Sequence, residues 1–327
     1  MTEALKIVDV PISPPPKPPA ILTRKLTKAY GTLLALDHLD LTLESGDLFG
    51  FIGPNGAGKT TTMKILAGLL GATSGQAQLM GREVSLNGDF VRRNVGYMPD
   101  SFGVYDDLKV SEYLEFFAAA YSLPRGERKR VVHDVLELTD LLEKRDAFVD
   151  SLSRGMQQRL GLARVLVHDP PVLLLDEPAS GLDPRARIEI RELLRELRRL
   201  GKTILISSHI LPELAECCNK LAIIERGKLV VTGTLDELTA MARAQQVISI
   251  RVVDDMERAA AVLRSDERVK GVETMDGELR VTIREENLHH HFLAERLVAA
   301  GLRLHSIAPY QMKLEDIFLR LTKGAVQ

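Results

Sequence analysis

The chain has 327 residues, of which 45% are hydrophobic, and this length suggests roughly two folded domains. Its 43 basic and 45 acidic residues give a formal net charge of -2, which excludes a general electrostatic attraction to nucleic acid or to an acidic membrane. The only two cysteines, Cys217 and Cys218, are adjacent, which excludes a disulfide framework and a Cys-x-x-Cys metal site. We interpret them as packing residues in a reducing compartment.

The N-terminal segment, residues 1–19, is a proline-rich arm that includes the stretch VPISPPPKPPA. Proline at this density favours an extended polyproline II conformation. The segment lacks the basic start and the apolar centre of a secretory signal peptide. The longest uncharged run of the chain, residues 65–81, contains four glycines and therefore does not match a membrane-spanning helix.

The strands of the first domain show two hydrophobic patterns. In HLDLTLESGD, Leu39, Leu41 and Leu43 alternate with polar residues, which is typical of a half-buried strand. We expect residues 20–45 and 76–84 to form an antiparallel sheet. The runs LFGFIG, VLLLDE and TILISS are continuously apolar, which indicates strands buried on both faces of a parallel sheet.

A helical insertion is expected between these strands, over about residues 100–168. Within it, the segment SEYLEFFAAAY predicts a helix that is capped at Ser111. The apolar stripe of this helix comprises Leu114, Phe117, Ala118 and Tyr121. A hairpin around AIIERGKLVVTG follows, and the first domain, residues 20–240, is expected to end soon after it.

The remaining residues, 241–327, predict a separate small α+β domain. Their pattern indicates a strand, a helix, two strands, a helix and a strand, which is the order of a ferredoxin-like split βαβ fold. A last helix is expected at KLEDIFLRLT. His289, His290 and His291 are consecutive, and neighbours on a helix point about 100° apart, so we interpret them as a solvated helix start and not as a metal site.

The segment GPNGAGKTT, residues 53–61, carries the pattern GxxxxGK[ST] between a predicted strand and a predicted helix. Its glycines allow backbone N–H groups to surround phosphate oxygens, Lys59 supplies a fixed positive charge, and Thr60 presents a hydroxyl to Mg²⁺. The predicted nucleotide-binding residues are Gly53, Pro54, Asn55, Gly56, Ala57, Gly58, Lys59, Thr60 and Thr61.

Two carboxylates follow the apolar run VLLLDEP. Asp176 and Glu177 end this predicted strand, which places them at the rim of the sheet beside the phosphate loop. Phosphoryl transfer depends mainly on positioning and on stabilising charge. We therefore expect Asp176 to hold Mg²⁺ and Glu177 to position and polarise the attacking water.

A second anion site is predicted in SLSRGMQQRL, where Ser153 and Gly155 open a helix. It is far along the chain from the phosphate loop, which begins its own helix. One chain therefore has two predicted places for one nucleotide, unless the second place serves another molecule.

These motifs, in this order, resemble the ATPase subunit of ATP-binding cassette (ABC) transporters over about residues 20–240. Tyr30 in KAYG matches the family's adenine-stacking aromatic, and LSRGMQQR at residues 152–159 matches its signature segment. SGLD at residues 180–183 matches its D-loop, and His209 in SSH matches its switch histidine, which we expect to sense the γ-phosphate. The resemblance implies a P-loop NTPase fold with a parallel core sheet, an antiparallel β subdomain and a helical insertion. The C-terminal domain resembles accessory domains of exporter-type ATPases.

In this family two cassettes pack head to tail around two ATP molecules. The resemblance therefore implies that Ser153 and Gly155 contact the nucleotide of a partner chain, either a second copy or a paralogous ATPase subunit. Closure around Mg-ATP and hydrolysis would power transport, in the export direction, through a separate membrane permease. The resemblance places the chain in the cytoplasm, on the cytoplasmic face of the membrane, with no nucleic-acid partner.

The chain departs from the family pattern at Asp100 and in the signature segment, which reads Leu-Ser-Arg-Gly-Met where Leu-Ser-Gly-Gly-Gln is commoner. Asp100 stands where a glutamine is usual, and a carboxylate there still reaches toward Mg²⁺. Arg154 stands where the signature commonly has glycine, and it either adds charge toward ATP or faces solvent. These departures suggest one alternative, a regulatory nucleotide-binding module, although the intact Asp176, Glu177 and His209 favour an active enzyme. A second alternative is a soluble non-transport ATPase, although such relatives usually join two cassettes in one chain or insert long coiled coils, and neither is found in this sequence.

Nearly half of the aromatic residues fall on the loop and helix that follow Asp100, at residues 97–121. We hypothesise that the exposed members of this set form the surface that receives the membrane subunit. They are Tyr97, Phe102, Tyr105, Tyr113, Phe116, Phe117 and Tyr121.

Overall fold

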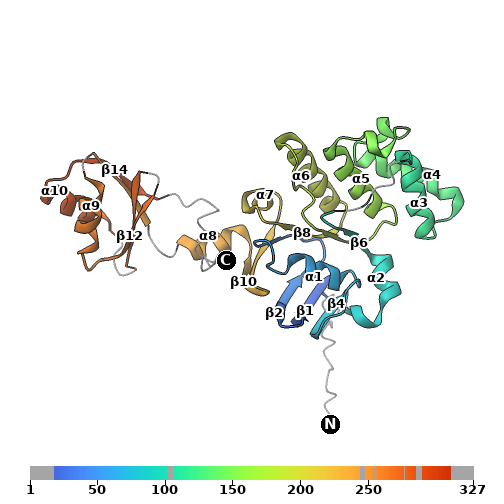
Figure 1. Cartoon of the computed structure of the whole chain (residues 1–327), viewed down its shortest axis with the longest axis horizontal. Helices are drawn as coiled ribbons and strands as arrows, with labels where there is room; N and C mark the ends of the chain where they lie inside the picture. Colours follow the sequence, from blue (N-terminus) through green and yellow to red (C-terminus); the bar gives the residue numbers. More distant parts are fainter. Residues whose placement is uncertain are drawn as a thin grey trace, which may run out of the picture.

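The computed structural model describes residues 18–101, 103, 107–243, 247–253, 255–275, 277–284 and 289–310. Its strands form three sheets, and its buried apolar side chains form three clusters (Figure 1). The expected proline-rich arm, apart from its last two residues, and the expected last helix lie outside the described residues.

The first strands of the chain form the expected antiparallel sheet, with the order β2-β1-β4-β5. These strands are β1 (Ile21–Tyr30), β2 (Leu33–Leu43), β4 (Ser74–Leu79) and β5 (Arg82–Glu83). In β2, Leu39, Leu41 and Leu43 are buried while the residues between them are exposed. The buried leucines pack in the same cluster as the apolar face of α1 (Lys59–Leu66), which follows the phosphate loop.

The core sheet has six strands in the order β10-β9-β3-β8-β7-β6. They are β3 (Leu48–Ile52), β6 (Val95–Met98), β7 (Val172–Leu175), β8 (Thr203–Ser208), β9 (Lys220–Glu225) and β10 (Lys228–Gly233). Every pairing in it is parallel except that of β9 with β10, which is the expected hairpin.

Residues of the core strands alternate between two hydrophobic clusters. In β7, for example, Leu173 and Leu175 join one cluster while Val172 and Leu174 join the other. The continuously apolar runs are therefore explained by burial on both faces, which confirms the predicted parallel core.

One face of the core sheet is covered by α5 (Arg154–Leu166), α6 (Pro184–Arg199) and α7 (Leu211–Ala215) (Figure 1). The helices α3 (Val110–Ala120) and α4 (Arg125–Leu138) pack against α5. Short 3₁₀ turns occupy Val84–Leu86, Leu142–Lys144 and Val149–Ser151, and α2 (Gly88–Asn94) precedes β6. The helix α8 (Leu235–Arg243) follows β10.

The prediction for the start of α3 was wrong, because Lys109 and not Ser111 is its N-cap residue. The first N–H groups of the helix are bound by backbone carbonyls: Val110 N donates to Ala147 O, and Ser111 N donates to Arg145 O. The Glu112 side chain accepts a hydrogen bond of 3.0 Å from Lys109 N, so the helix begins earlier than a hydroxyl signal indicates. Its fully buried face consequently includes Val110 and Tyr113, in addition to the expected Leu114 and Ala118.

The third sheet has the order β12-β13-β11-β14, and all of its pairings are antiparallel. Its strands are β11 (Val247–Val252), β12 (Val269–Met275), β13 (Glu278–Ile283) and β14 (Leu304–Pro309), with α9 (Met256–Arg264) after β11 and α10 (His291–Ala299) after β13. This is the chain order and the strand order of the split βαβ arrangement. His290 occupies the N-cap position of α10, as the helix-start interpretation expected.

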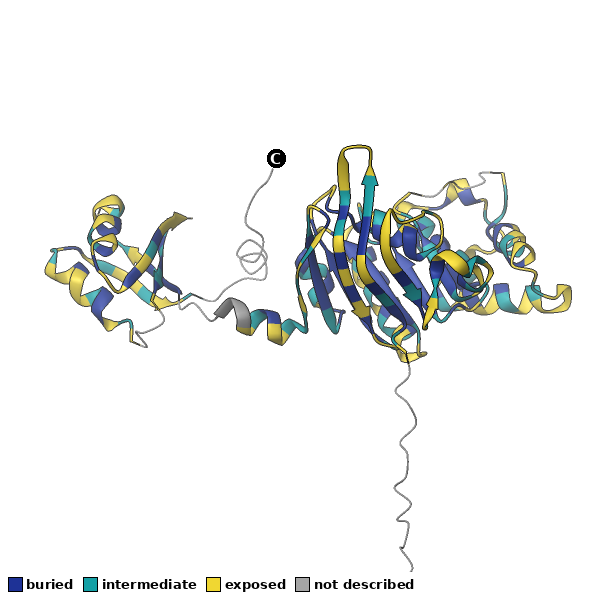
Figure 2. Cartoon of the chain, turned by 90° about the horizontal axis from the view of Figure 1, so that it is seen from below, coloured by how far each residue is buried: buried dark blue, intermediate teal, exposed yellow. Residues whose placement is uncertain are grey.

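Figure 2 shows that buried residues follow the strands, whereas exposed residues gather on the outer faces of helices and at loop ends. Cys217 and Cys218 are buried, with their Sγ atoms 3.9 Å apart. Both belong to the cluster that contains Leu173 and Leu175, between the core sheet and the helices. Among the described helices, none has the length and apolar character that are needed to cross a bilayer.

Candidate nucleotide-binding site

The phosphate loop lies between β3 and α1, and close contacts explain two of its glycines. A Cβ on Gly53 would lie 2.3 Å from the carbonyl oxygen of Ile224, on β9. Gly58 has a φ of +108°, and a Cβ there would lie 2.7 Å from the carbonyl oxygen of Ala35, on β2. Side chains at either position would push the loop away from the sheet, so the loop keeps its curve only with glycine. Pro54, Asn55, Gly56 and Thr60 are exposed, Thr61 is partly exposed, and Ala57 is buried.

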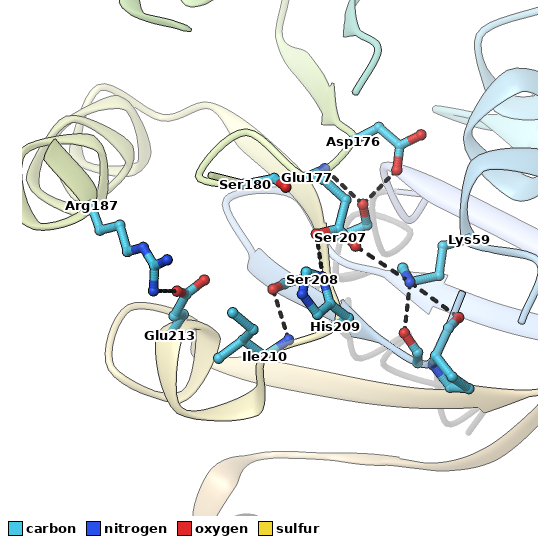
Figure 3. Close-up of polar contacts among 12 residues, drawn as sticks. Lys59, Asp176, Glu177, Ser180, Arg187, Ser207, Ser208, His209, Ile210 and Glu213 are labelled. Atoms are coloured by element: carbon cyan, nitrogen blue, oxygen red, sulfur yellow. Dashed lines mark hydrogen bonds and ion pairs between the residues drawn. The ribbon is translucent and has the colours of Figure 1, made fainter. Parts of the chain in front are cut away.

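Lys59 is the first residue of α1, and its side chain is only 6% exposed. Its Nζ donates hydrogen bonds to the carbonyl oxygens of Gly53 (2.6 Å) and Pro54 (3.3 Å) (Figure 3). The same Nζ lies 3.4 Å from Oε1 of Glu177, at the end of β7. The buried ammonium group of Lys59 thus joins the phosphate loop to the carboxylate of Glu177, which follows β7.

Asp176 is 1% exposed, and its two carboxylate oxygens have different surroundings. Oδ1 accepts a hydrogen bond of 2.6 Å from Ser207 Oγ, whereas Oδ2 is buried without a hydrogen-bond partner among the described residues. A buried unpartnered carboxylate oxygen is unfavourable unless a cation or a water meets it. Together with the exposed hydroxyl of Thr60, it gives the oxygen ligands that Mg²⁺ prefers, so these residues fit the expected metal.

Glu177 is held in a left-handed backbone conformation, with φ of +51°. Its N–H donates to Ser207 Oγ (2.9 Å), and its Oε2 lies 2.8 Å from Nδ1 of His209, just beyond β8 (Figure 3). Because an ionised carboxylate only accepts hydrogen bonds, Nδ1 of His209 is the donor in this pair. The structure therefore brings Lys59, Asp176, Glu177 and His209 into one cluster.

Sequence reasoning missed Ser207. Its hydroxyl donates to Asp176 and accepts from the backbone of Glu177, so one fully buried side chain fixes both acids. A signal was present, because a hydroxyl inside a strand that is buried on both faces needs hydrogen-bond partners.

Asp100 is exposed and follows β6, the strand beside β7. Burial, followed by the charges of Asp176 and Asp100, raises the pKa of the Tyr97 hydroxyl to about 12. Tyr30, at the end of β1, is 47% exposed, and Lys28 Nζ lies 5.2 Å from its ring centroid.

The second predicted anion site lies at the start of α5. Ser153 is the N-cap residue, and its Oγ accepts a hydrogen bond of 3.4 Å from Met156 N. A Cβ on Gly155 would lie 3.3 Å from Cβ of Ala186, in the first turn of α6, so this glycine allows the two helix starts to approach. An open hollow of 620 Å³ lies here, lined by residues from 137–159 and 181–189. No phosphate-loop residue lines it, so the two predicted anion sites are separate places on the chain.

The aromatic set is divided by the structure. Tyr113 is fully buried, whereas Phe116 and Tyr121 are 50% and 38% exposed. Phe102 and Tyr105, two further members of this set, lie outside the described residues.

Comparisons with known proteins agree on one family. The family model described as ABC transporter matches residues 36–180. The Nod factor export ATP-binding protein I of Paraburkholderia xenovorans is 36% identical, over 94% of this chain and 98% of that protein. The linearmycin resistance ATP-binding protein of Bacillus subtilis is 30% identical, over 91% of this chain and 96% of that protein. The dimeric structure of a bacterial ABC transporter cassette is similar with a TM-score of 0.60 and 26% identity, and the match covers 66% of this chain and 98% of that one.

Proposed function

Because this chain belongs to the ABC transporter family of ATP-binding proteins, we propose that it binds Mg-ATP on residues 53–61 and closes head to tail on a partner. The partner is a second copy, or a paralogous ATPase subunit, whose signature segment completes the site. Hydrolysis then opens the pair and drives export through a separate membrane permease. The chain would work on the cytoplasmic face of the membrane.

The geometry of the cluster supports roles for its residues. Lys59 binds phosphate oxygens, Thr60 and Asp176 hold Mg²⁺ with Asp100 near them, and Tyr30 stacks on adenine. When bound, Mg²⁺ neutralises charge that develops on the phosphates. Glu177 accepts a hydrogen bond from the water whose oxygen attacks the γ-phosphorus, as the bond from that phosphorus to the β-phosphate oxygen breaks. His209 orients this carboxylate through the 2.8 Å contact and faces the γ-phosphate.

The separation of the two anion sites is the observation that carries the proposal. The exposed start of α5, with Ser153 and Gly155, has no phosphate-loop residue among the groups that line its hollow. A helix start of this kind favours an anion. A head-to-tail pair supplies that anion from the nucleotide of the other chain and completes two sites at once.

The export direction and the docking of the permease have less direct support than the composite sites. Two similar proteins are named for export of Nod factor and for resistance to linearmycin, which favours outward transport here. Phe116 and Tyr121 provide exposed aromatic surface on the helical insertion, where we propose that the permease docks. A permease that co-purifies with the chain and raises its ATPase rate would support both points.

Cysteine pairing between chains tests the head-to-tail geometry. Both native cysteines are first replaced by alanine, and then Asn55→Cys and Ser153→Cys are made in separate chains. Both positions are exposed. With Mg-ATP, a thiol cross-linker should join the two variants when they are mixed and should leave each variant alone uncrosslinked. Cross-linking of the Ser153→Cys chain to itself, or none in the mixture, would contradict the proposed pair.

A further inference from the structure

Arg154, the first residue of α5, is exposed, as one of the two interpretations of its sequence position expected, but its side chain also contacts the chain itself. Its Nη2 donates a hydrogen bond of 3.3 Å to the carbonyl oxygen of Ser180, in the D-loop of the same chain. Its guanidinium also covers Gly181, where a Cβ would lie 2.3 to 2.6 Å from the Nη2, Cζ and Nη1 atoms. The side chain therefore lies over the D-loop backbone, and in this conformation it occupies the space that a side chain at residue 181 would take.

The D-loop is attached to the proposed water-positioning acid. Ser180 N donates a hydrogen bond of 3.0 Å to the carbonyl oxygen of Glu177, which closes a turn over residues 177–180. Glu177 has the left-handed φ of +51°, which a residue with a side chain adopts only when its surroundings hold it there. A shift of the D-loop backbone thus acts directly on the backbone of Glu177.

The backbone of Arg154 belongs to the signature segment, whereas its side chain contacts the D-loop. The backbone of Arg154 forms the first turn of α5, next to Ser153, which is the N-cap. Gly155 brings this turn against Ala186 in the first turn of α6, whose N-cap residue, Asp183, is the last residue of the D-loop. The backbone of Arg154 is therefore part of the half site that faces the partner's nucleotide, while its side chain contacts the turn that holds the chain's own Glu177.

We propose that Arg154 is a positioning residue that couples the two nucleotide sites of a pair, an inference that rests on the proposed composite sites. When a partner's triphosphate is bound at the start of α5, the guanidinium fixes Ser180 and Gly181. The turn over residues 177–180 then places Glu177 for the water at this chain's own nucleotide. Each site consequently reaches full turnover only when the other is occupied.

Steady-state hydrolysis as a function of ATP concentration tests this role. Wild-type turnover should rise cooperatively with ATP, because both sites must fill. Arg154→Ala should lower kcat about 3- to 10-fold, as expected for loss of one positioning hydrogen bond, and should bring the Hill coefficient toward about 1. Its KM should stay within about 2-fold of the wild type, because its phosphate contacts remain.

Two further variants separate coupling from loss of charge. Arg199→Ala removes an exposed arginine from the last turn of α6, outside this hollow, where its side chain pairs with Glu196, and it should leave kcat and cooperativity unchanged. Arg154→Lys keeps the charge but not the planar group that covers Gly181, so it should behave like Arg154→Ala. Recovery of wild-type kinetics by lysine would instead assign Arg154 to the phosphate and overturn the proposal.

Gly181→Ala provides an independent measurement. In the wild-type background its methyl group meets the guanidinium, whereas in Arg154→Ala only the backbone strain at φ of +68° remains. The fold-loss in kcat caused by Gly181→Ala should therefore be smaller in the Arg154→Ala background. Equal losses in both backgrounds would contradict the contact.

Whether variants form the closed pair shows if the coupling role of Arg154 is wrong or if the composite sites are wrong. Glu177→Gln and Glu177→Gln with Arg154→Ala should both form nucleotide-locked pairs. If the double variant remains a single chain while Glu177→Gln forms a pair, Arg154 binds phosphate and the coupling role is wrong. If the variant that carries only Glu177→Gln remains a single chain, the composite sites themselves are wrong. Wild-type kinetics without cooperativity, or Arg154→Ala kinetics equal to those of Arg199→Ala, would also overturn the coupling role.

Discussion

The two regions that we propose to contact phosphate are built in opposite ways. Lys59 and Asp176 are almost completely buried, and Ser207 connects the acids through hydrogen bonds within the chain. Ser153 and Arg154 are exposed at the start of α5, beside an open hollow. Groups that are fixed by contacts within their own chain are oriented in advance and shielded from water. Groups that meet the nucleotide of another chain must remain open until that chain arrives. The difference predicts that mutations in the two regions fail in different ways.

The largest effect is expected at the buried cation. Lys59→Ala removes the charge that meets phosphate and leaves the nearby Glu177 carboxylate uncompensated. Affinity for ATP should fall by about 2 to 4 kcal/mol, or about 30- to 1000-fold, which isothermal titration calorimetry measures. Lys64→Ala, at an exposed position of the same helix, is the matched control and should bind ATP normally. Equal binding by both variants would remove Lys59 from the phosphate site.

The second effect separates binding from chemistry within the buried region. Glu177→Gln keeps the shape of the side chain but weakens its interaction with the attacking water. We expect kcat to fall at least about 100-fold, a change of about 2.7 kcal/mol in the barrier, while ATP affinity stays close to that of the wild type. Glu213→Gln, which breaks only an ion pair with Arg187, is the control. Similar rates for the two variants would mean that Glu177 does not position the water.

A smaller effect is expected at Ser207, which sequence reasoning missed. Ser207→Ala leaves Asp176 Oδ1 and the Glu177 N–H without their shared partner, so the free energy of unfolding should fall by about 1 to 3 kcal/mol. Turnover should fall about 10-fold, because both acids lose their support. Ser208→Ala removes only a local bond to Ile210 N and should have a weaker effect on turnover. Urea unfolding and ATPase assays compare the two variants, and equal turnover would show that Ser207 does not align the acids.

The smallest effect at neutral pH is expected at His168, which lies at the end of α5 opposite its exposed start. His168 follows this helix and stacks on Tyr121 with ring centroids 3.7 Å apart. Burial lowers the pKa of His168 from 6.5 to about 4, because the charged form is desolvated. The folded state therefore favours the neutral ring, so its contribution to stability is present above pH 6.5 and is lost as pH falls from 6.5 through 4.

His168→Phe should consequently lose less stability than the wild type between pH 6.5 and 4, as measured by thermal unfolding at a series of pH values. His133→Phe, at an exposed position of α4, should keep the wild-type pH dependence. If His168→Phe also keeps it, the ring is not held neutral in the fold.

Local patterns were enough to predict much of the fold and part of the candidate site. The runs around Leu174 showed burial on both faces, because a two-sided sheet imposes continuous apolarity. The glycine pattern of residues 53–61 and the acids at the end of β7 were predictable since their chemistry depends on adjacent residues. Contacts between distant segments were not predictable. The Arg154 side chain meets a carbonyl 26 residues away, and the backbone of residues 145–147 replaced the expected cap of α3.

The mass of the Glu177→Gln protein in Mg-ATP tests the central claim most directly, because it asks whether each triphosphate lies between two chains. Light scattering coupled to size-exclusion chromatography, with bound nucleotide quantified in the same peak, measures both quantities. We predict a pair that contains two ATP molecules and that separates into single chains when ATP is removed. A single chain that retains one ATP at saturating Mg-ATP would contradict the composite site.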